Sequence, residues 1–309
     1  MQELQTAITT ENLCKEYYGR AALSELNLKI LSGEIHALLG HNGAGKSTTM
    51  KILAGLMPQT SGNSTILGRI GYLPEQPPLY LDMRVRDFLR FVGKIHNVPT
   101  ATLRSKIEEV VATLSLDKFC DRLIGNLSKG QRQRIGVAMV LLYDPQIYIL
   151  DEPTIGLDPA SLVELRQVIK QLQQKQKTVL ISTHQLSEVN HLCDSLTILQ
   201  QGRALYSGAM QSLQEMFKFN APIMQLTLRE YRPEVQKQLL DNFKEIKKIS
   251  YHKNGEHTEI RVVTNIDRPN LQDEIMGTLM HYNCGILSFT QESFTLEDIY
   301  LKMTKQNHL

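Results

Sequence analysis

A glycine-rich stretch followed by a lysine and two hydroxyl residues is the part of this sequence best suited to chemistry. It comprises Gly40, His41, Asn42, Gly43, Ala44, Gly45, Lys46, Ser47 and Thr48. Glycines let successive backbone N–H groups converge on one anion, and a helix that starts behind them adds its positive end. Lys46 can then reach the terminal phosphates of a nucleotide, and the Ser47 hydroxyl is a hard oxygen ligand suited to Mg²⁺. A glycine turn that only caps a helix would not explain the Lys-Ser pair.

The segments on either side supply the context that such a loop requires. Residues 35–39 form a short apolar run that predicts a buried strand, and residues 48–56 predict a helix. A strand, a glycine-rich loop and a helix in this order are typical of a nucleoside triphosphate site.

Two carboxylates follow a second apolar run. Residues 146–150 predict a buried parallel strand that ends in Asp151 and Glu152. Open α/β sheets bind their ligands at this end of their strands. Asp151 is therefore a candidate to hold Mg²⁺ through its water shell, and Glu152 to polarise the water that attacks the γ-phosphorus. A solvated acidic loop is the alternative.

A histidine ends the next predicted strand. Residues 160–174 predict a helix, and residues 178–182 an apolar strand that delivers Thr183 and His184 at its carboxyl end. We expect His184 at the same sheet edge as Asp151 and Glu152, where its imidazole can reach a phosphate oxygen or the attacking water.

Two further candidates have a structural and a functional interpretation. Ser128 and Gln131 fit a capping box at the start of a helix that runs to Leu142, but a helix start with a serine and Gly130 is also an anion site. Tyr17 is either a stacking platform for adenine or an exposed tyrosine in the turn at residues 17–20. The residues themselves leave both choices open.

Size and composition limit the class of protein. With 309 residues the chain can form two domains, and its net charge of +2 gives no overall field for nucleic acid or membrane. No apolar run approaches the roughly 18 to 20 residues that span a bilayer, and the first residues lack the pattern of a secretory signal. The four cysteines have no metal-ligand spacing, so we expect free thiols in a reducing cytosol.

The rest of the first two thirds predicts strands at 6–13, 22–30, 64–67 and 70–73 and helices at 85–96 and 100–114. The prolines between residues 74 and 78 predict an irregular loop.

The last third predicts strands at 223–228, 246–251, 258–263 and 286–290 and helices at 233–243 and 270–282, behind a linker near residues 218–222. This βαββαβ order is ferredoxin-like. The lysines at positions 244, 247, 248 and 253 are more typical of a solvated face than of a nucleic-acid site, so no nucleic-acid partner is expected.

Taken together and in this order, the motifs from about Thr6 to Gly208 resemble the nucleotide-binding subunit of an ATP-binding cassette (ABC) transporter, of the exporter-type branch with a C-terminal accessory domain. Residues 40–47 resemble its Walker A motif, residues 147–151 its Walker B motif, and residues 127–131 its signature sequence. By the same resemblance Glu152 is the catalytic glutamate, His184 the switch histidine, residues 156–158 the D-loop, and Tyr17 the adenine platform.

The sequence departs from the family pattern in the signature, the Q-loop and a connection. Lys129 stands where the signature more often has a glycine. Glu75 stands at the Q-loop position and Gln76 follows it, which leaves open which of them approaches the Mg²⁺ and the attacking water. The connection from Gly62 to Ile70 is short, and we expect a trimmed hairpin there.

The resemblance implies an α/β fold with a P-loop NTPase core, an N-terminal antiparallel β subdomain and a helical signature subdomain at about residues 84–143. An ATP-binding domain would span residues 1–215, and a small α+β domain residues 222–309. It also implies an ATPase with ATP and Mg²⁺ as cofactors, in which two chains sandwich two ATP molecules head to tail. Ser128, Gly130 and Gln131 of one chain would then contact the ATP held by the other, and Asp158 is a further candidate nucleotide contact.

The implied partners are a second ATP-binding subunit, most simply a copy of this chain, and a polytopic permease that docks near residues 75–91. The protein would be cytoplasmic and peripheral on the inner face of the cell membrane, and would drive export. A soluble ABC ATPase in translation or DNA repair is the competing interpretation, but such proteins usually carry two cassettes or a long coiled-coil insertion. A P-loop kinase would not explain residues 127–131 or His184.

Overall fold

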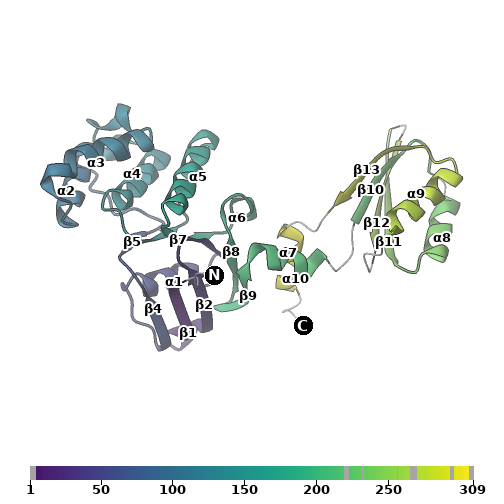
Figure 1. Cartoon of the computed structure of the whole chain (residues 1–309), viewed down its shortest axis with the longest axis horizontal. Helices are drawn as coiled ribbons and strands as arrows, with labels where there is room; N and C mark the ends of the chain where they lie inside the picture. Colours follow the sequence, from purple (N-terminus) through teal and green to yellow (C-terminus); the bar gives the residue numbers. More distant parts are fainter. Residues whose placement is uncertain are drawn as a thin grey trace. The chain divides into compact units, whose positions relative to one another are not determined.

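The computed structural model describes residues 5–218, 223–231, 233–255, 257–264, 270–292 and 296–305. The chain divides into two compact units, Met1–Met210 and Gln211–Leu309 (Figure 1). Most of the predicted linker, residues 219–222, lies outside the described residues. The helix α7, Met210–Lys218, spans the predicted end of the first domain at residue 215.

A six-stranded sheet forms the centre of the first unit. Its strands are β3 (Ile35–Leu39), β5 (Ile70–Leu73), β6 (Ile147–Asp151), β7 (Thr178–Thr183), β8 (Ser195–Gln200) and β9 (Arg203–Ala209). Their order is β5-β6-β7-β3-β8-β9, in which only β9 runs antiparallel to its neighbour. Every residue of β3, β6, β7 and β8 is buried. Continuous apolar runs are what strands covered on both faces require.

The parallel register brings three loops to one edge of this sheet. Leu39 of β3 pairs with Thr183 of β7, and Ser182 of β7 pairs with Asp151 of β6. The glycine-rich loop, the two carboxylates and His184 therefore all leave the sheet at the same side.

A three-stranded antiparallel sheet packs against this core. It contains β1 (Thr6–Tyr17), β2 (Arg20–Leu31) and β4 (Ser61–Ile66), in the order β2-β1-β4. The first strand continues beyond the predicted residue 13, because Asn12 and Glu25 take positive φ angles of 47° and 52° and the pairing continues past the irregularity. Side chains of both sheets and of α1 (Lys46–Leu53) share one hydrophobic cluster.

The prediction of a hairpin between Gly62 and Ile70 is wrong. β4 pairs with β1 in the three-stranded sheet, whereas β5 pairs with β6 in the six-stranded sheet. Gly71 on β5 lies so close to Val140 and Pro145 that a Cβ there would be 2.5 Å from the Val140 side chain. The short connection thus carries the chain from the three-stranded sheet to the six-stranded sheet, where β5 packs against Val140 and Pro145.

Helices complete the first unit. The signature region contains α2 (Val85–Ile95), α3 (Thr100–Thr113) and α4 (Lys129–Leu141), which lie together in Figure 1. The helices α5 (Pro159–Gln174) and α6 (Leu186–Leu192) connect the later strands. The helix α1 begins at Lys46, two residues before the predicted start, because Gly45 at φ 109° lets the chain enter the helix directly from the loop.

The second unit contains β10 (Ile223–Leu228), α8 (Pro233–Asn242), β11 (Ile246–Asn254), β12 (His257–Thr264), α9 (Leu271–His281), β13 (Ile286–Glu292) and α10 (Leu296–Lys305). Its antiparallel sheet has the order β11-β12-β10-β13, and α8 and α9 cover one face (Figure 1). Residues 293–295 lie outside the described residues, and α10 begins directly after them. In the described part of the chain, no helix has both the length and the apolar character needed to cross a membrane.

We predict that Gly62→Ala destabilises the first unit by about 2 to 4 kcal/mol, because the new side chain would combine strain with overpacking. Gly62 has a φ of 82°, and a Cβ there would lie 2.2 Å from the Asn12 carbonyl oxygen. Urea unfolding of the full chain measures the change.

The matched control is Gly19→Ala. Gly19 has a similar φ of 77°, but a Cβ would meet nothing within 4 Å. This substitution should cost only about 1 kcal/mol, for the left-handed backbone alone. Equal losses from both substitutions would contradict the close approach at Gly62.

Candidate functional site

A cavity of about 420 Å³ lies at the edge where β3, β6 and β7 end. Its lining joins the glycine-rich loop to residues from β2, from the loop after β5 and from the ends of β6 and β7. The lining residues are Ala22, Asn42, Gly43, Ala44, Gly45, Lys46, Ser47, Thr48, Glu75, Glu152, Ile155 and His184.

The backbone of the glycine-rich loop is held in a shape that only glycine accommodates. Gly43 and Gly45 have φ angles of 82° and 109°. A Cβ at Gly45 would lie 2.7 Å from the Leu23 side chain, and one at Gly40 would lie 2.6 Å from the Leu199 carbonyl oxygen. The loop therefore leads directly into α1, whose first N–H groups have no partner inside the helix. Free N–H groups and the positive helix end make the loop an anion site.

Lys46 is buried within this loop. Its Nζ donates to the carbonyl oxygens of Gly40 at 2.7 Å and His41 at 3.3 Å, and it lies 3.6 Å from Glu152 Oε1. Only 6% of the side chain is exposed. The ammonium is thus held at the centre of the loop, where a bound phosphate would meet it.

Glu152 faces two basic groups. His184 Nδ1 lies 3.0 Å from each carboxylate oxygen, and Lys46 contacts the carboxylate from the start of α1. The carboxylate is buried, whereas 45% of the His184 side chain is exposed. With its proton on Nδ1, the imidazole donates to the carboxylate and can face the cavity with its other nitrogen.

Asp151 lies behind the cavity lining. Its side chain is buried, and its Oδ1 accepts a hydrogen bond of 2.5 Å from the Ser182 hydroxyl. The same hydroxyl accepts the Glu152 backbone N–H at 2.8 Å. The Asp151 and Glu75 carboxylates and the Ser47 hydroxyl are hard oxygen donors of the kind that Mg²⁺ prefers.

Glu75 and Gln76 occupy different places. Glu75 lines the phosphate cavity, and it also lines a neighbouring cavity of about 460 Å³ together with Gln76, Lys129 and Arg132. Of these two cavities, Gln76 lines only the neighbouring one. The geometry therefore favours Glu75 as the residue that reaches the phosphate site.

The signature residues lie apart from the phosphate cavity. Ser128 and Gln131 form the predicted capping box, in which the Ser128 hydroxyl accepts the Gln131 N–H at 3.2 Å and the Gln131 side chain accepts the Ser128 N–H at 3.0 Å. A Cβ at Gly130 would lie 2.7 Å from the Gly156 carbonyl oxygen. The start of α4 therefore packs closely against the loop that leads to Asp158.

Asp158 caps the helix on the other side of this contact. Its carboxylate accepts the Ser161 N–H at 2.9 Å and the Ser161 hydroxyl at 2.5 Å. Arg134 of α4 donates to that hydroxyl and lies 3.2 Å from Glu164. The start of α4, with Ser128, Gly130 and Gln131, thus lies against the loop before Asp158, and none of these four residues lines the phosphate cavity.

Tyr17 ends β1 and is 38% exposed. Its hydroxyl lies 2.7 Å from Met57 Sδ, and Lys15 Nζ lies 5.3 Å from the ring centroid. Neither Tyr17 nor His41 lines the phosphate cavity, so their nucleotide contacts stay predictions.

Sequence reasoning missed three residues of this region. The sequence does carry a signal for Ser182, because this polar residue ends an apolar strand that leads to the same sheet edge as Asp151. Ala22 reaches the cavity from the three-stranded sheet, and Ile155 from the loop after Glu152. Nothing in the local sequence distinguishes these two.

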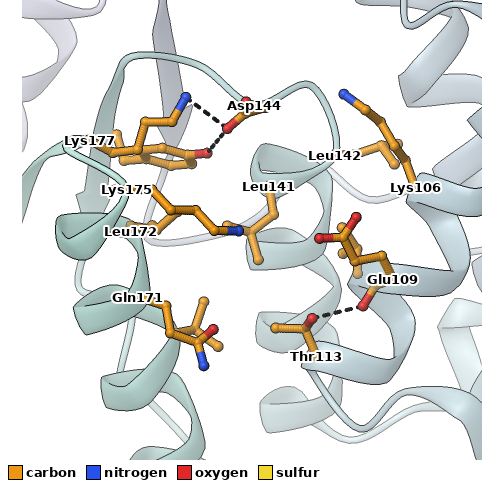
Figure 2. Close-up of a pocket in the computed structure, with 13 residues that line it drawn as sticks. Lys106, Glu109, Thr113, Leu141, Leu142, Asp144, Gln171, Leu172, Lys175 and Lys177 are labelled. Atoms are coloured by element: carbon orange, nitrogen blue, oxygen red, sulfur yellow. Dashed lines mark hydrogen bonds and ion pairs between the residues drawn. The ribbon is translucent and has the colours of Figure 1, made fainter. Parts of the chain in front are cut away.

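A separate cavity of about 380 Å³ lies at the opposite ends of β6 and β7 (Figure 2). Lys177 Nζ lies 2.9 Å from Asp144 Oδ1, to which the buried Tyr148 hydroxyl also donates. Lys175 is the C-cap of α5, where the helix dipole favours a cation. These charges support the local structure, and the cavity takes no part in the phosphate site.

A protein-family model described as ABC transporter matches residues 23–155, and one described as AAA domain, putative AbiEii toxin, Type IV TA system, matches residues 121–190. An uncharacterized ABC transporter ATP-binding protein of Bacillus subtilis, YxlF, is 32% identical over 96% of this chain and 99% of its own length. The bacitracin transport ATP-binding protein BcrA of Bacillus licheniformis is 31% identical over 97% of this chain and 98% of its own. A solved structure described as the ATP binding subunit of an ABC transporter superposes with a TM-score of 0.65 at 29% identity, covering 69% of this chain and 93% of that one.

The cap at Asp158 generates a pH-dependent prediction. Hydrogen bonds from Ser161 hold the pKa of the Asp158 carboxyl below its usual range, with a smaller effect from Arg134. A depressed carboxyl pKa stabilises the fold above the unfolded value of about 3.9, and this contribution is lost as the pH falls through the folded pKa. Asp158→Ala should therefore lower the melting temperature at pH 7 by more than it does at pH 3.

The control is Asp82→Ala, which changes an exposed aspartate in the turn before α2. It should leave the pH dependence of the melting temperature unaltered. If Asp158→Ala lowered the melting temperature equally at pH 7 and pH 3, the proposed stabilisation by the ionised Asp158 cap would be contradicted.

Proposed function

The chain belongs to the ATP-binding subunits of ABC transporters, and we propose that it binds and hydrolyses ATP to drive a separate membrane permease. The observation that carries this proposal is the Glu152 carboxylate, which lies beside the phosphate loop between Lys46 and His184. A water-positioning carboxylate and a cation at one phosphate site are groups that phosphoryl transfer to water uses.

The glycine-rich loop and Lys46 would hold the nucleotide. The N–H groups of this loop would face the phosphates, and Lys46 would exchange its contacts with the Gly40 and His41 carbonyl oxygens for the β- and γ-phosphates. Tyr17 would stack on the adenine ring.

Ser47, Asp151 and Glu75 would hold Mg²⁺, and Gln76 is a less favourably placed alternative to Glu75. When bound, the metal ion neutralises charge on the phosphates during the displacement. Ser47 lines the cavity, whereas the buried Asp151 does not and suits contact through water.

Glu152 would take the proton of the attacking water or orient that water, a contribution of about 10² to 10⁴ in rate. His184 would hold the carboxylate in place through its Nδ1 proton and reach the γ-phosphate with its exposed side. The contact between Lys46 and Glu152 would loosen as the phosphates attract the ammonium, which would free the carboxylate for water.

A second copy of the chain would complete the site. Ser128, Gly130, Gln131 and Asp158 do not line the phosphate cavity of their own chain, which fits a role toward the nucleotide of another chain. A head-to-tail homodimer places the positive start of each α4 against the γ-phosphate of the facing ATP. ATP would then join the two copies, and hydrolysis would release them.

Export through a polytopic permease fits the relatives, one of which is named for bacitracin transport. The permease would dock near residues 75–91, where Tyr80, Leu81 and Phe91 expose 51%, 51% and 37% of their surface. The protein would thus work on the cytoplasmic face of the membrane through this partner. A soluble ABC ATPase in translation or DNA repair is not favoured, since the relatives are named as transporter subunits.

We assign residues 1–215 to the ATP-binding domain and residues 222–309 to a ferredoxin-like accessory domain. The βαββαβ order and the sheet order β11-β12-β10-β13 support this assignment. Both full-length relatives include the accessory region, which fits a role in regulation or in support of the dimer.

We predict that Glu152→Gln lowers ATP turnover by about 10² or more while ATP binding persists, because the amide cannot act as a base. The variant should accumulate as an ATP-bound dimer, since closure no longer leads to hydrolysis. Size-exclusion chromatography with light scattering, with and without ATP, measures the dimer.

The control for this measurement is Glu164→Gln, which changes a carboxylate beside Arg134 outside the phosphate cavity. It should leave turnover close to that of the unaltered chain. Full turnover by Glu152→Gln would remove the glutamate from the proposed role.

We also predict that the tagged full chain, purified from detergent-solubilised native membranes, retains a polytopic membrane protein. Alanine at both Tyr80 and Leu81 should weaken this recovery, because it removes exposed apolar surface from the proposed docking region. Mass spectrometry of the purified complex identifies the partner. Recovery of ribosomes or DNA in place of a membrane protein would support the competing function.

A further inference from the structure

The hydroxyl of Ser182 connects the two acidic residues of the site. Ser182 lies on β7 directly opposite Asp151 of β6, and its side chain is fully buried. The hydroxyl donates to Asp151 Oδ1 at 2.5 Å and accepts the Glu152 N–H at 2.8 Å. We propose that Ser182 is a positioning residue that fixes how Asp151 and Glu152 face the phosphate cavity, an inference that rests on the proposed function.

The backbone at Glu152 needs such support. Its φ of 48° lies in the left-handed region, which is unfavourable for a side chain of this size. The strand β6 ends at Asp151, so the Glu152 N–H has left the sheet and takes the Ser182 hydroxyl as its acceptor. The Glu152 carbonyl accepts the Ile155 N–H at 3.2 Å and the Gln133 side chain at 3.5 Å. Hydrogen bonds on both sides of the residue therefore hold its unusual conformation.

This conformation determines where the carboxylates point. Adjacent residues of a regular strand direct their side chains to opposite faces of the sheet. The left-handed backbone at Glu152 breaks this alternation, and the carboxylate meets Lys46 and His184. The same hydroxyl restrains the Asp151 carboxylate through Oδ1. One side chain thus couples the orientation of the proposed metal ligand to that of the proposed base.

The other end of the same strand offers a matched comparison. Thr178 begins β7, is also buried, and accepts the Gly33 N–H at 3.0 Å with its hydroxyl. It lines neither the phosphate cavity nor the cavity beside it. Thr178→Val therefore removes a buried hydroxyl from β7 without touching either carboxylate.

The first measurement needs no nucleotide. Ser182→Ala should increase the hydrogen exchange rate of the Glu152 amide in the full chain, because that N–H loses its acceptor. Ser182→Thr retains a hydroxyl and should retain the protection. Ser182→Cys preserves the packing but is a poor hydrogen-bonding partner, so it reports on the same loss if the alanine variant does not fold.

The second measurement separates positioning from stability. Ser182→Ala should lower kcat and the affinity of the ATP complex for Mn²⁺, read by electron paramagnetic resonance, by roughly tenfold or more, because partners that orient metal ligands have effects of this size. ATP affinity without metal should change little. Thr178→Val should leave kcat and Mn²⁺ affinity near those of the unaltered chain, even where both variants lower the melting temperature.

The outcomes distinguish this inference from the proposed function. If the unaltered chain hydrolyses ATP and Ser182→Ala and Ser182→Cys keep kcat and Mn²⁺ affinity within about twofold, the positioning role is overturned and the function stands. Equal losses from Thr178→Val would also overturn the role, because they would show a general effect on β7. No ATP hydrolysis by the unaltered chain would overturn both.

Discussion

The buried carboxylate of Glu152 can stay ionised only beside basic partners, and the rest of the first unit holds those partners next to it. An isolated ionised carboxylate away from water costs several kcal/mol. Lys46 at the start of α1 and His184 after β7 contact this carboxylate, and Ser182 and Gln133 hold the Glu152 backbone through hydrogen bonds. A buried charge with such partners is stable in one arrangement, so the strand ends must stay in register.

That requirement explains the order of the central sheet. β7 contains Ser182 and leads to His184, and it lies between β3, which leads to the glycine-rich loop, and β6, which leads to the two carboxylates. A slip of one residue would turn every side chain of a strand to the other face. The continuous burial of these strands opposes such a slip, and in this way the hydrophobic core sets the geometry of polar groups at its edge.

The sequence was sufficient for the elements with strong local signals. The strand at Ile35–Leu39, the capping box at Ser128 and the convergence of Lys46, Glu152 and His184 follow from apolar runs and motif spacing. Pairing between distant segments is less accessible, because a short connection between two strands predicts a hairpin, whereas β4 and β5 each join a different sheet. The left-handed backbone at Glu152 and its bond to Ser182 depend on tertiary contacts, which no local pattern encodes.

The placement of Ser128, Gly130 and Asp158 away from their own cavity leads to the central claim, which is that two chains share each catalytic site. The most direct test is the rate of ATP hydrolysis per chain over a dilution series of about a hundredfold at saturating ATP and Mg²⁺. A shared site predicts that the rate per chain falls with dilution, because association follows mass action. A rate per chain that stays constant down to concentrations at which light scattering shows only monomers would contradict the account.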